Sequence, residues 1–99
     1  MPAYLIYRAS IYDMDAYREN YMSQTPAILE AYGGKFIARG GTVETLEGDV
    51  ESRRVVLIEF PSMEAAKAFY NSDEYTRARA ARAGIADAQM ILLDGVPVE

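Results

Sequence analysis

The sequence contains no cysteine and no histidine among its 99 residues. Without cysteine there can be no disulfide, no thiolate nucleophile and no Fe–S ligation. Without histidine the chain lacks the commonest general base and metal ligand of proteins. These absences exclude more chemistry than any motif in the sequence suggests, and we expect neither a metal ion nor a cofactor.

The chain is also short of positive charge. It has 10 basic residues against 15 acidic ones, a formal net charge of −5, and this charge repels both a phosphate backbone and an anionic membrane. There is no run of about 18 apolar residues. Met1-Pro2-Ala3 leads directly into strand-like sequence, so no charged and apolar leader is expected. We predict a cytoplasmic protein with no nucleic-acid or membrane partner.

Apolar residues, in contrast, are abundant for so short a chain. They make up 51 % of the sequence and include eight Tyr and three Phe. The length predicts a single domain over residues 1–99, and a domain of this size buries only roughly 60 to 65 % of the surface of its unfolded chain. Part of the apolar surface is therefore expected to meet a second chain.

The first half of the chain predicts a strand, a helix and a second strand. The run AYLIYRASI is rich in β-formers, and Asp13 offers an N-cap for the helix. Pro26 falls inside this helix and predicts a kink or break near residues 23–25. Gly40-Gly41 suggests a bulge through which the second strand continues. The predicted elements are a strand over residues 3–11, a helix from 13 to about 32 and a strand from 35 to 46.

The second half predicts the same order of elements. Pro61 ends the third strand, Ser62 caps a helix, and Ser72 caps a further helical segment that Gly84 closes. The predicted strands cover residues 54–60 and 88–93. The order β-α-β-β-α-β predicts an α+β, ferredoxin-like fold with an antiparallel sheet and the helices on one face.

Both faces of the predicted sheet are largely apolar. A sheet covered on one face should show polar residues on the other, yet Leu57 alternates with Val56 and Ile58, and Leu5 with Tyr4 and Ile6. The simplest way to bury the open face is to place it against the same face of a second copy. We therefore predict a homodimer with a shared barrel-like interior.

Two charged residues interrupt the strands beside the central turn. Arg39 ends the apolar run of the second strand, and Glu59 lies within VVLIEF of the third. Pairing about Gly48-Asp49 with a bulge at the double glycine would bring the two side chains nearly opposite each other. One interpretation is a structural ion pair. The other makes Arg39 an anion contact and Glu59 a base whose pKa is raised by burial.

Tyrosines near the second helix extend the second interpretation. Tyr70 and Tyr75 could form the walls of a pocket that stacks an aromatic or flat ligand beside Arg39 and Gly40. The alternative is that these tyrosines are core or interface residues whose hydroxyls reach water or backbone groups. Ser62 and Ser72 are interpreted as helix caps, because no histidine is available to activate them as nucleophiles.

Several motifs together resemble the family of domains of unknown function numbered 1330 (DUF1330), in the dimeric α/β-barrel superfamily. The resemblance covers nearly the whole chain and rests on Asp13 and Tyr17, Tyr32 to Phe36, Arg39 to Gly41, Leu46 to Gly48, Arg54, Ile58 to Ser62 and Phe69 to Tyr75. Phe69 stands where similar sequences often have Trp, and Asp73 where Pro is common. Both departures leave the fold unaffected.

The resemblance implies a ferredoxin-like dimer and carries no established activity. Relatives in the wider superfamily include cofactor-free monooxygenases, isomerases and haem-binding enzymes, and this chain has no histidine to ligate haem. Two functional hypotheses remain. The first is a pocket that binds, or transforms without a cofactor, a small anionic or aromatic metabolite. The second is a non-catalytic homodimerisation or accessory module in which the Arg-Glu pair is structural.

Overall fold

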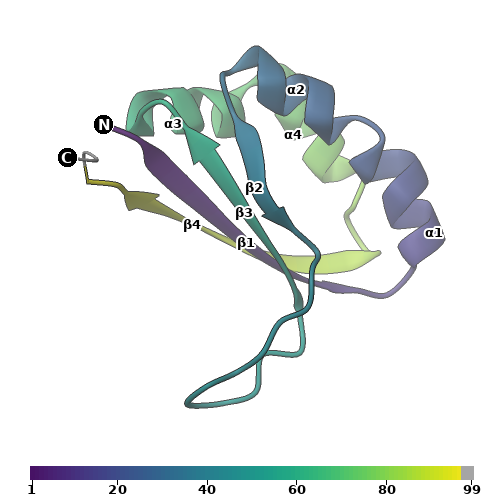
Figure 1. Cartoon of the computed structure of the whole chain (residues 1–99). Helices are drawn as coiled ribbons and strands as arrows, with labels where there is room; N and C mark the ends of the chain where they lie inside the picture. Colours follow the sequence, from purple (N-terminus) through teal and green to yellow (C-terminus); the bar gives the residue numbers. More distant parts are fainter. Residues whose placement is uncertain (97–99) are drawn as a thin grey trace.

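A four-stranded antiparallel sheet forms one layer of the molecule, and the helices cover one of its faces (Figure 1). The computed structural model describes residues 1–96. The strand order is β2-β3-β1-β4, so the predicted ferredoxin-like arrangement is confirmed. The strands are β1 (Ala3–Ile11), β2 (Lys35–Arg39), β3 (Arg54–Phe60) and β4 (Ala86–Asp94).

The first helical region is divided into three short pieces. They are α1 (Met14–Tyr17), a π-helical turn η1 (Arg18–Met22) and α2 (Thr25–Ala31). The Asp13 side chain caps α1 by accepting a hydrogen bond from the Ala16 N–H at 3.1 Å. Pro26 lies in the first turn of α2, where its missing N–H breaks no helical bond. The break predicted near residues 23–25 is confirmed.

One serine joins the two helices that follow β3. Helix α3 (Met63–Asn71) starts after Ser62, whose hydroxyl oxygen accepts from the Ala65 N–H. Helix α4 (Asp73–Ala80) starts after Ser72, whose oxygen accepts from the Tyr75 N–H at 3.1 Å. Ser72 also donates to the Phe69 carbonyl at the end of α3. The two helices thus change direction at a residue that stabilises both, as the two predicted caps require.

The alternation of side chains along the central strands determines where the core lies. Leu5 and Tyr7 of β1 face the helices, as do Val56, Ile58 and Phe60 of β3, and all five side chains are buried. The intervening residues face the other side of the sheet, which no helix covers. Apolar residues Tyr4, Ile6, Leu57, Ile91 and Leu93 lie on this open face.

The chain between β2 and β3 differs from the prediction. Residues 40–53 form no strand, and the strand predicted to continue to residue 46 ends at Arg39. The bulge lies between Phe36 and Ala38, before the double glycine. Gly40 adopts a φ of +68°, outside the strand region, and this turns the backbone out of the sheet.

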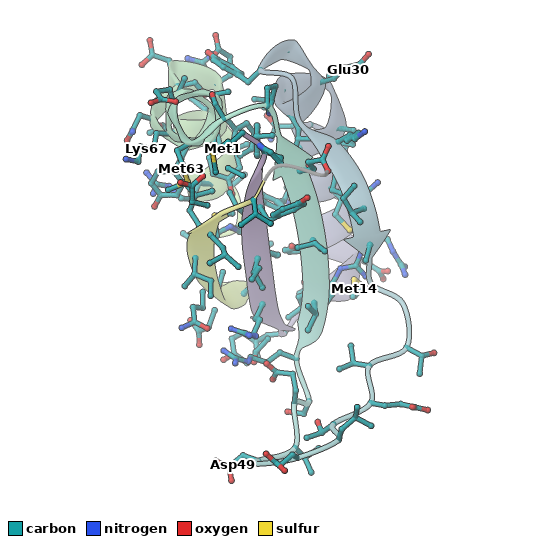
Figure 2. All side chains as sticks on the ribbon, turned by 60° about the vertical axis from the view of Figure 1, so that its left-hand side comes forward. Met1, Met14, Glu30, Asp49, Met63 and Lys67 are labelled. Carbon is teal, nitrogen blue, oxygen red and sulfur yellow. The ribbon has the colours of Figure 1, made fainter. Side chains whose placement is uncertain are left out.

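Residues 40–53, which we call the arm, project from the end of the sheet. Figure 2 shows Asp49 at the tip of the arm, well away from the strands. The base of the arm is held by Glu51, whose carboxylate bonds to Arg53 at 2.8 Å and to Arg8 of β1 at 3.1 Å. The large apolar side chains Leu46 and Val50 are 93 % and 82 % exposed.

Candidate functional site

Four tyrosines meet between the sheet and the helices. Tyr7 comes from β1, Tyr17 from α1, Tyr21 from η1 and Tyr75 from α4. The Tyr7 and Tyr17 hydroxyl oxygens are 2.7 Å apart, and those of Tyr21 and Tyr75 are 2.6 Å apart. The rings of Tyr17 and Tyr21 are also in contact, with centroids separated by 5.0 Å. Two hydrogen-bonded pairs thus form one aromatic cluster.

This cluster lines a hollow that we call the tyrosine pocket. The centres of water molecules can occupy about 30 Å³ of it, and the empty space amounts to about 410 Å³ when the open mouth is included. The lining comprises the four tyrosines, Arg39 and Arg54, and Met22, Thr25, Leu29, Phe36, Val56, Ile58, Phe69 and Met90. It contains no carboxylate, so its charge is positive.

Burial keeps the tyrosine hydroxyls protonated. Desolvation is the largest cause that raises the pKa of Tyr17, Tyr21 and Tyr75 above 10.0, the ordinary value for tyrosine. The hydrogen bond between Tyr17 and Tyr7 raises the pKa of Tyr17 further. At neutral pH these phenols therefore donate hydrogen bonds and do not act as phenolate bases.

Two arginines stand at the rim of the pocket. Arg39 ends β2 on the helix-facing side, opposite Val56, and its guanidinium carbon lies 4.3 Å from the centre of the Phe36 ring. Arg54 begins β3 opposite Ala9, on the same face of the sheet. Its side chain packs against Gly40, where a Cβ atom would collide with the guanidinium. Gly40 therefore shapes the rim through Arg54 and does not line the pocket itself.

A third guanidinium lies behind the tyrosines. The Arg82 guanidinium carbon is 5.3 Å from the centre of the Tyr21 ring and 5.7 Å from that of Tyr7. Such cation–π contacts stabilise a partly buried arginine that lacks a carboxylate partner. None of the three salt bridges found among residues 1–96 includes Arg82. Arginine side chains thus place positive charge on two sides of the aromatic cluster.

The prediction that Arg39 and Glu59 lie opposite each other is wrong. Glu59 pairs with Lys35 across β2 and β3, and the Lys35 Nζ to Glu59 Oε1 distance is 3.4 Å. The bulge between Phe36 and Ala38 shifts the register, so that Arg39 is opposite Val56. Arg39 faces the helices and Glu59 faces the open side. Glu59 therefore cannot serve as a base in the tyrosine pocket.

The two tyrosines predicted as pocket walls are separated. Tyr75 lines the tyrosine pocket with Arg39. The Tyr70 hydroxyl instead accepts a hydrogen bond from Arg79, whose guanidinium carbon lies 4.5 Å from the centre of the Tyr70 ring. Tyr70 lines a different hollow beside β4. Of the predicted ligand-binding residues, the structure brings Arg39 and Tyr75 together and places Gly40 next to them.

Tyr7 and Arg54 line the pocket and Arg82 lies behind it, and none of the three was predicted from the sequence. A signal was available for two of them. Tyr7 is two residues from Leu5 and therefore shares its buried face, and Arg54 is likewise two residues from Val56 on β3. No comparable signal exists for Arg82, because it follows the end of α4 in a turn whose direction the sequence does not determine.

The described part of the chain contains no cluster suited to a metal ion. Within residues 1–96, no three Asp or Glu side chains lie close enough together to hold one. No helix in this range is long and apolar enough to cross a membrane.

Solved structures with the same architecture define the class of fold. RPA0582, a protein of unknown function from Rhodopseudomonas palustris, is 21 % identical with a TM-score of 0.77, over 98 % of this chain and 84 % of that one. SnoaB from Streptomyces nogalater, a cofactor-independent oxygenase, is 14 % identical with a TM-score of 0.67. The match covers 98 % of this chain and 95 % of SnoaB. A dimeric protein of unknown function and ferredoxin-like fold from Bacteroides fragilis is 13 % identical with a TM-score of 0.55, over 95 % and 96 %.

The protein is thus a small ferredoxin-like α+β domain with an arginine-rimmed aromatic pocket. The model of the family described as domain of unknown function DUF1330 matches residues 2–96, and the chain belongs to this family. The resemblance drawn from the sequence motifs is therefore confirmed. A search of curated proteins found no match.

Proposed function

We propose that the tyrosine pocket binds a small metabolite that is an anion, an aromatic compound or both. The observation that carries this proposal is the pair Arg39 and Arg54 at the rim of a pocket whose lining has no carboxylate. Two guanidinium groups on one side of a partly apolar hollow favour a carboxylate or enolate oxygen. Because the protein has a net charge of −5, an anionic ligand is attracted to this local positive site and repelled by the rest of the surface.

The size of the pocket determines how a ligand would lie. A space of about 30 Å³ for the centres of water molecules holds roughly two of them, so an aromatic ring does not fit among the four tyrosines. We therefore place the ring at the mouth, beside the two arginines. The anionic group would then contact the guanidinium groups, and the inner phenols would reach the ligand through a water molecule.

The chemistry of the lining supports binding more than base-driven catalysis. It contains no carboxylate, and the buried phenols Tyr17, Tyr21 and Tyr75 are protonated at neutral pH. A transformation without a cofactor, as in the oxygenase SnoaB, would have to start from a substrate that is already an anion. The arginines would stabilise its negative charge, which is the one catalytic contribution the rim can offer.

We further propose that the chain forms a homodimer through the open face of its sheet. Ile91 and Leu93 on this face are 43 % and 57 % exposed, and Tyr4, Ile6 and Leu57 lie beside them. The similar fold from Bacteroides fragilis is dimeric. This surface also supports the alternative of a dimerisation module, but the Arg39–Glu59 pair of that alternative does not form.

The binding proposal can be tested with benzoate and its neutral isostere benzamide. We expect benzoate to raise the melting temperature in a saturable way, because a ligand that binds only the folded state stabilises it by mass action. Benzamide should have little effect. Arg39→Met and Arg54→Met should each abolish the shift, whereas Arg77→Met, on the exposed surface of α4, should retain it. An equal response to benzoate and benzamide would disprove the role of the arginines.

A further inference from the structure

A second hollow lies on the helix-facing side of the sheet, beside the edge strand β4. We call it the β4 cavity; it measures about 290 Å³ and is separate from the mouth of the tyrosine pocket. Its polar lining comes from Lys67, Tyr70 and Asn71 of α3 and from Arg82, and its apolar floor includes Leu5 and Leu92. This volume is close to the lower end of the range for small-molecule sites.

The cavity exists because α3 does not cover the edge of the sheet. Ala86 at the start of β4 is buried, but Ala88, Met90 and Leu92, which face the same side, are partly or fully exposed. Figure 2 shows Lys67 on the outer side of α3, at the same side of the molecule as β4. An apolar floor thus remains accessible beside the positive charge of Lys67.

Neither cation of the cavity has a carboxylate partner in the part of the chain that the structure describes. Neither Lys67 nor Arg82 takes part in a salt bridge among residues 1–96. The Arg82 guanidinium lies over the rings of Tyr7 and Tyr21, which stabilise its positive charge but do not neutralise it. The lining contains no Asp or Glu, although the chain has 15 acidic residues.

We propose that the β4 cavity is a binding site for a small aliphatic carboxylate. Its carboxylate oxygens would accept a hydrogen bond from Lys67 and would lie near the positive charge of Arg82, since both residues line the cavity. Its hydrocarbon chain would lie over Ala88 and Leu92, removing their exposed surface from water. This site goes beyond the function proposed for the tyrosine pocket and does not depend on it.

The two hollows share one wall. Met90 lines both, and the Tyr75 hydroxyl lies 3.8 Å from the Met90 sulfur. Arg82 lines the β4 cavity and also contacts the faces of Tyr7 and Tyr21. The same guanidinium therefore supports the aromatic cluster from behind. Substitution of Arg82 would disturb both sites, so the test relies on residues that belong to the β4 cavity alone.

The test is a titration of the isotopically labelled protein with hexanoate, followed by nuclear magnetic resonance. We expect saturable shifts of the backbone amides of Ala66, Ala88 and Leu92. Lys67→Met should weaken binding about tenfold, since it removes one charged hydrogen bond. Ala88→Phe should abolish binding, because the larger side chain fills the cavity. Hexanamide should bind at least tenfold more weakly than hexanoate.

Two control variants make the result decisive. Lys35→Met removes a lysine on the open face and should leave hexanoate binding unchanged. Arg39→Met removes the rim of the tyrosine pocket and should also leave it unchanged, so failure of the proposed function is distinguishable from failure of this site. The proposal is overturned if hexanoate produces no saturable shifts, if Ala88→Phe binds it as the unmodified chain does, or if Arg39→Met removes the effect.

Discussion

At the scale of single residues, the paired tyrosine hydroxyls stabilise the interior of the pocket. Tyr21 and Tyr75 are 6 % and 0 % exposed, their hydroxyls bond to each other, and the Tyr75 hydroxyl also contacts the Met90 sulfur. We expect Tyr21→Phe to lower the free energy of unfolding by about 1 to 2 kcal/mol, since it leaves a buried hydroxyl with a poorer partner. Urea denaturation measures this difference. Tyr12→Phe, at an exposed site on the surface, is the control and should change it by less than about 0.5 kcal/mol.

The same tyrosines predict how stability depends on pH. Folding raises the pKa of Tyr17, Tyr21 and Tyr75 above 10.0. Their contribution to the free energy of unfolding is therefore fully present below pH 10. It decreases above pH 10, because phenols in the unfolded chain lose protons that those in the folded chain retain. Each such group lowers the free energy of unfolding by about 1.4 kcal/mol for each pH unit in this range.

Unfolding free energies measured on both sides of pH 10 test this dependence. The decrease above pH 10 should be less steep in Tyr17→Phe than in the unmodified chain. Lysine and arginine titrate in the same range, so the comparison between the two proteins carries the result. Equal slopes would contradict the assignment of Tyr17 as a buried, protonated phenol.

Residue-scale prediction from the sequence succeeded where periodicity was enough and failed where one residue changed the register. Leu5 and Tyr7 alternate with Tyr4 and Ile6 in the sequence, and this correctly predicts that the two pairs lie on opposite faces of β1. For Arg39, however, the single bulged position in β2 decides which face it occupies. A shift of one residue reverses the side-chain direction, and no sequence signal identified this position.

At the scale of elements, Ser72 holds two helices with one hydroxyl. It accepts from the Tyr75 N–H, donates to the Phe69 carbonyl, and is 8 % exposed. We predict that Ser72→Ala lowers the unfolding free energy by about 2 kcal/mol, whereas Ser62→Ala, which removes one capping bond, costs about 1 kcal/mol. Thermal and chemical denaturation of both variants measure the difference. Equal costs would show that the bond to Phe69 contributes nothing.

The caps and helix breaks were predictable because their signals are local, whereas the arm was not. Ser62, Ser72 and Pro26 act on backbone groups within three residues. Residues 42–46 have β-forming side chains, but a strand also needs a partner strand at the right distance. The turn at Gly40 directs the arm away from β3, and this long-range geometry is absent from local propensity.

At the scale of the whole molecule, the open face of the sheet predicts association. A charge placed there should oppose burial against a second copy. We expect Ile91→Glu to reduce dimerisation at least tenfold while the protein stays folded, because Ile91 is 43 % exposed in the single chain. Sedimentation velocity across a dilution series measures this. Ala31→Glu adds the same charge on the helical layer and serves as the control; a monomeric unmodified chain would refute the dimer.

The architecture could be predicted at this scale because the order of six elements restricts the topology to few possibilities. The candidate site could not be predicted to the same extent. It is assembled from Tyr7, Tyr17, Tyr75, Arg39 and Arg54, which come from five different elements. Their convergence depends on packing angles and on one bulge, neither of which is encoded in a short motif.

The most direct test of the central claim is to observe the arginine side chains while an anion is added. The Nε–H resonances of Arg39 and Arg54 can be followed by nuclear magnetic resonance during a titration with benzoate. We predict that both move together and saturate at one affinity, while that of Arg77 stays in place. If the Arg39 and Arg54 resonances stay in place while the shifts of other resonances reach saturation with benzoate, the tyrosine pocket is not an anion site.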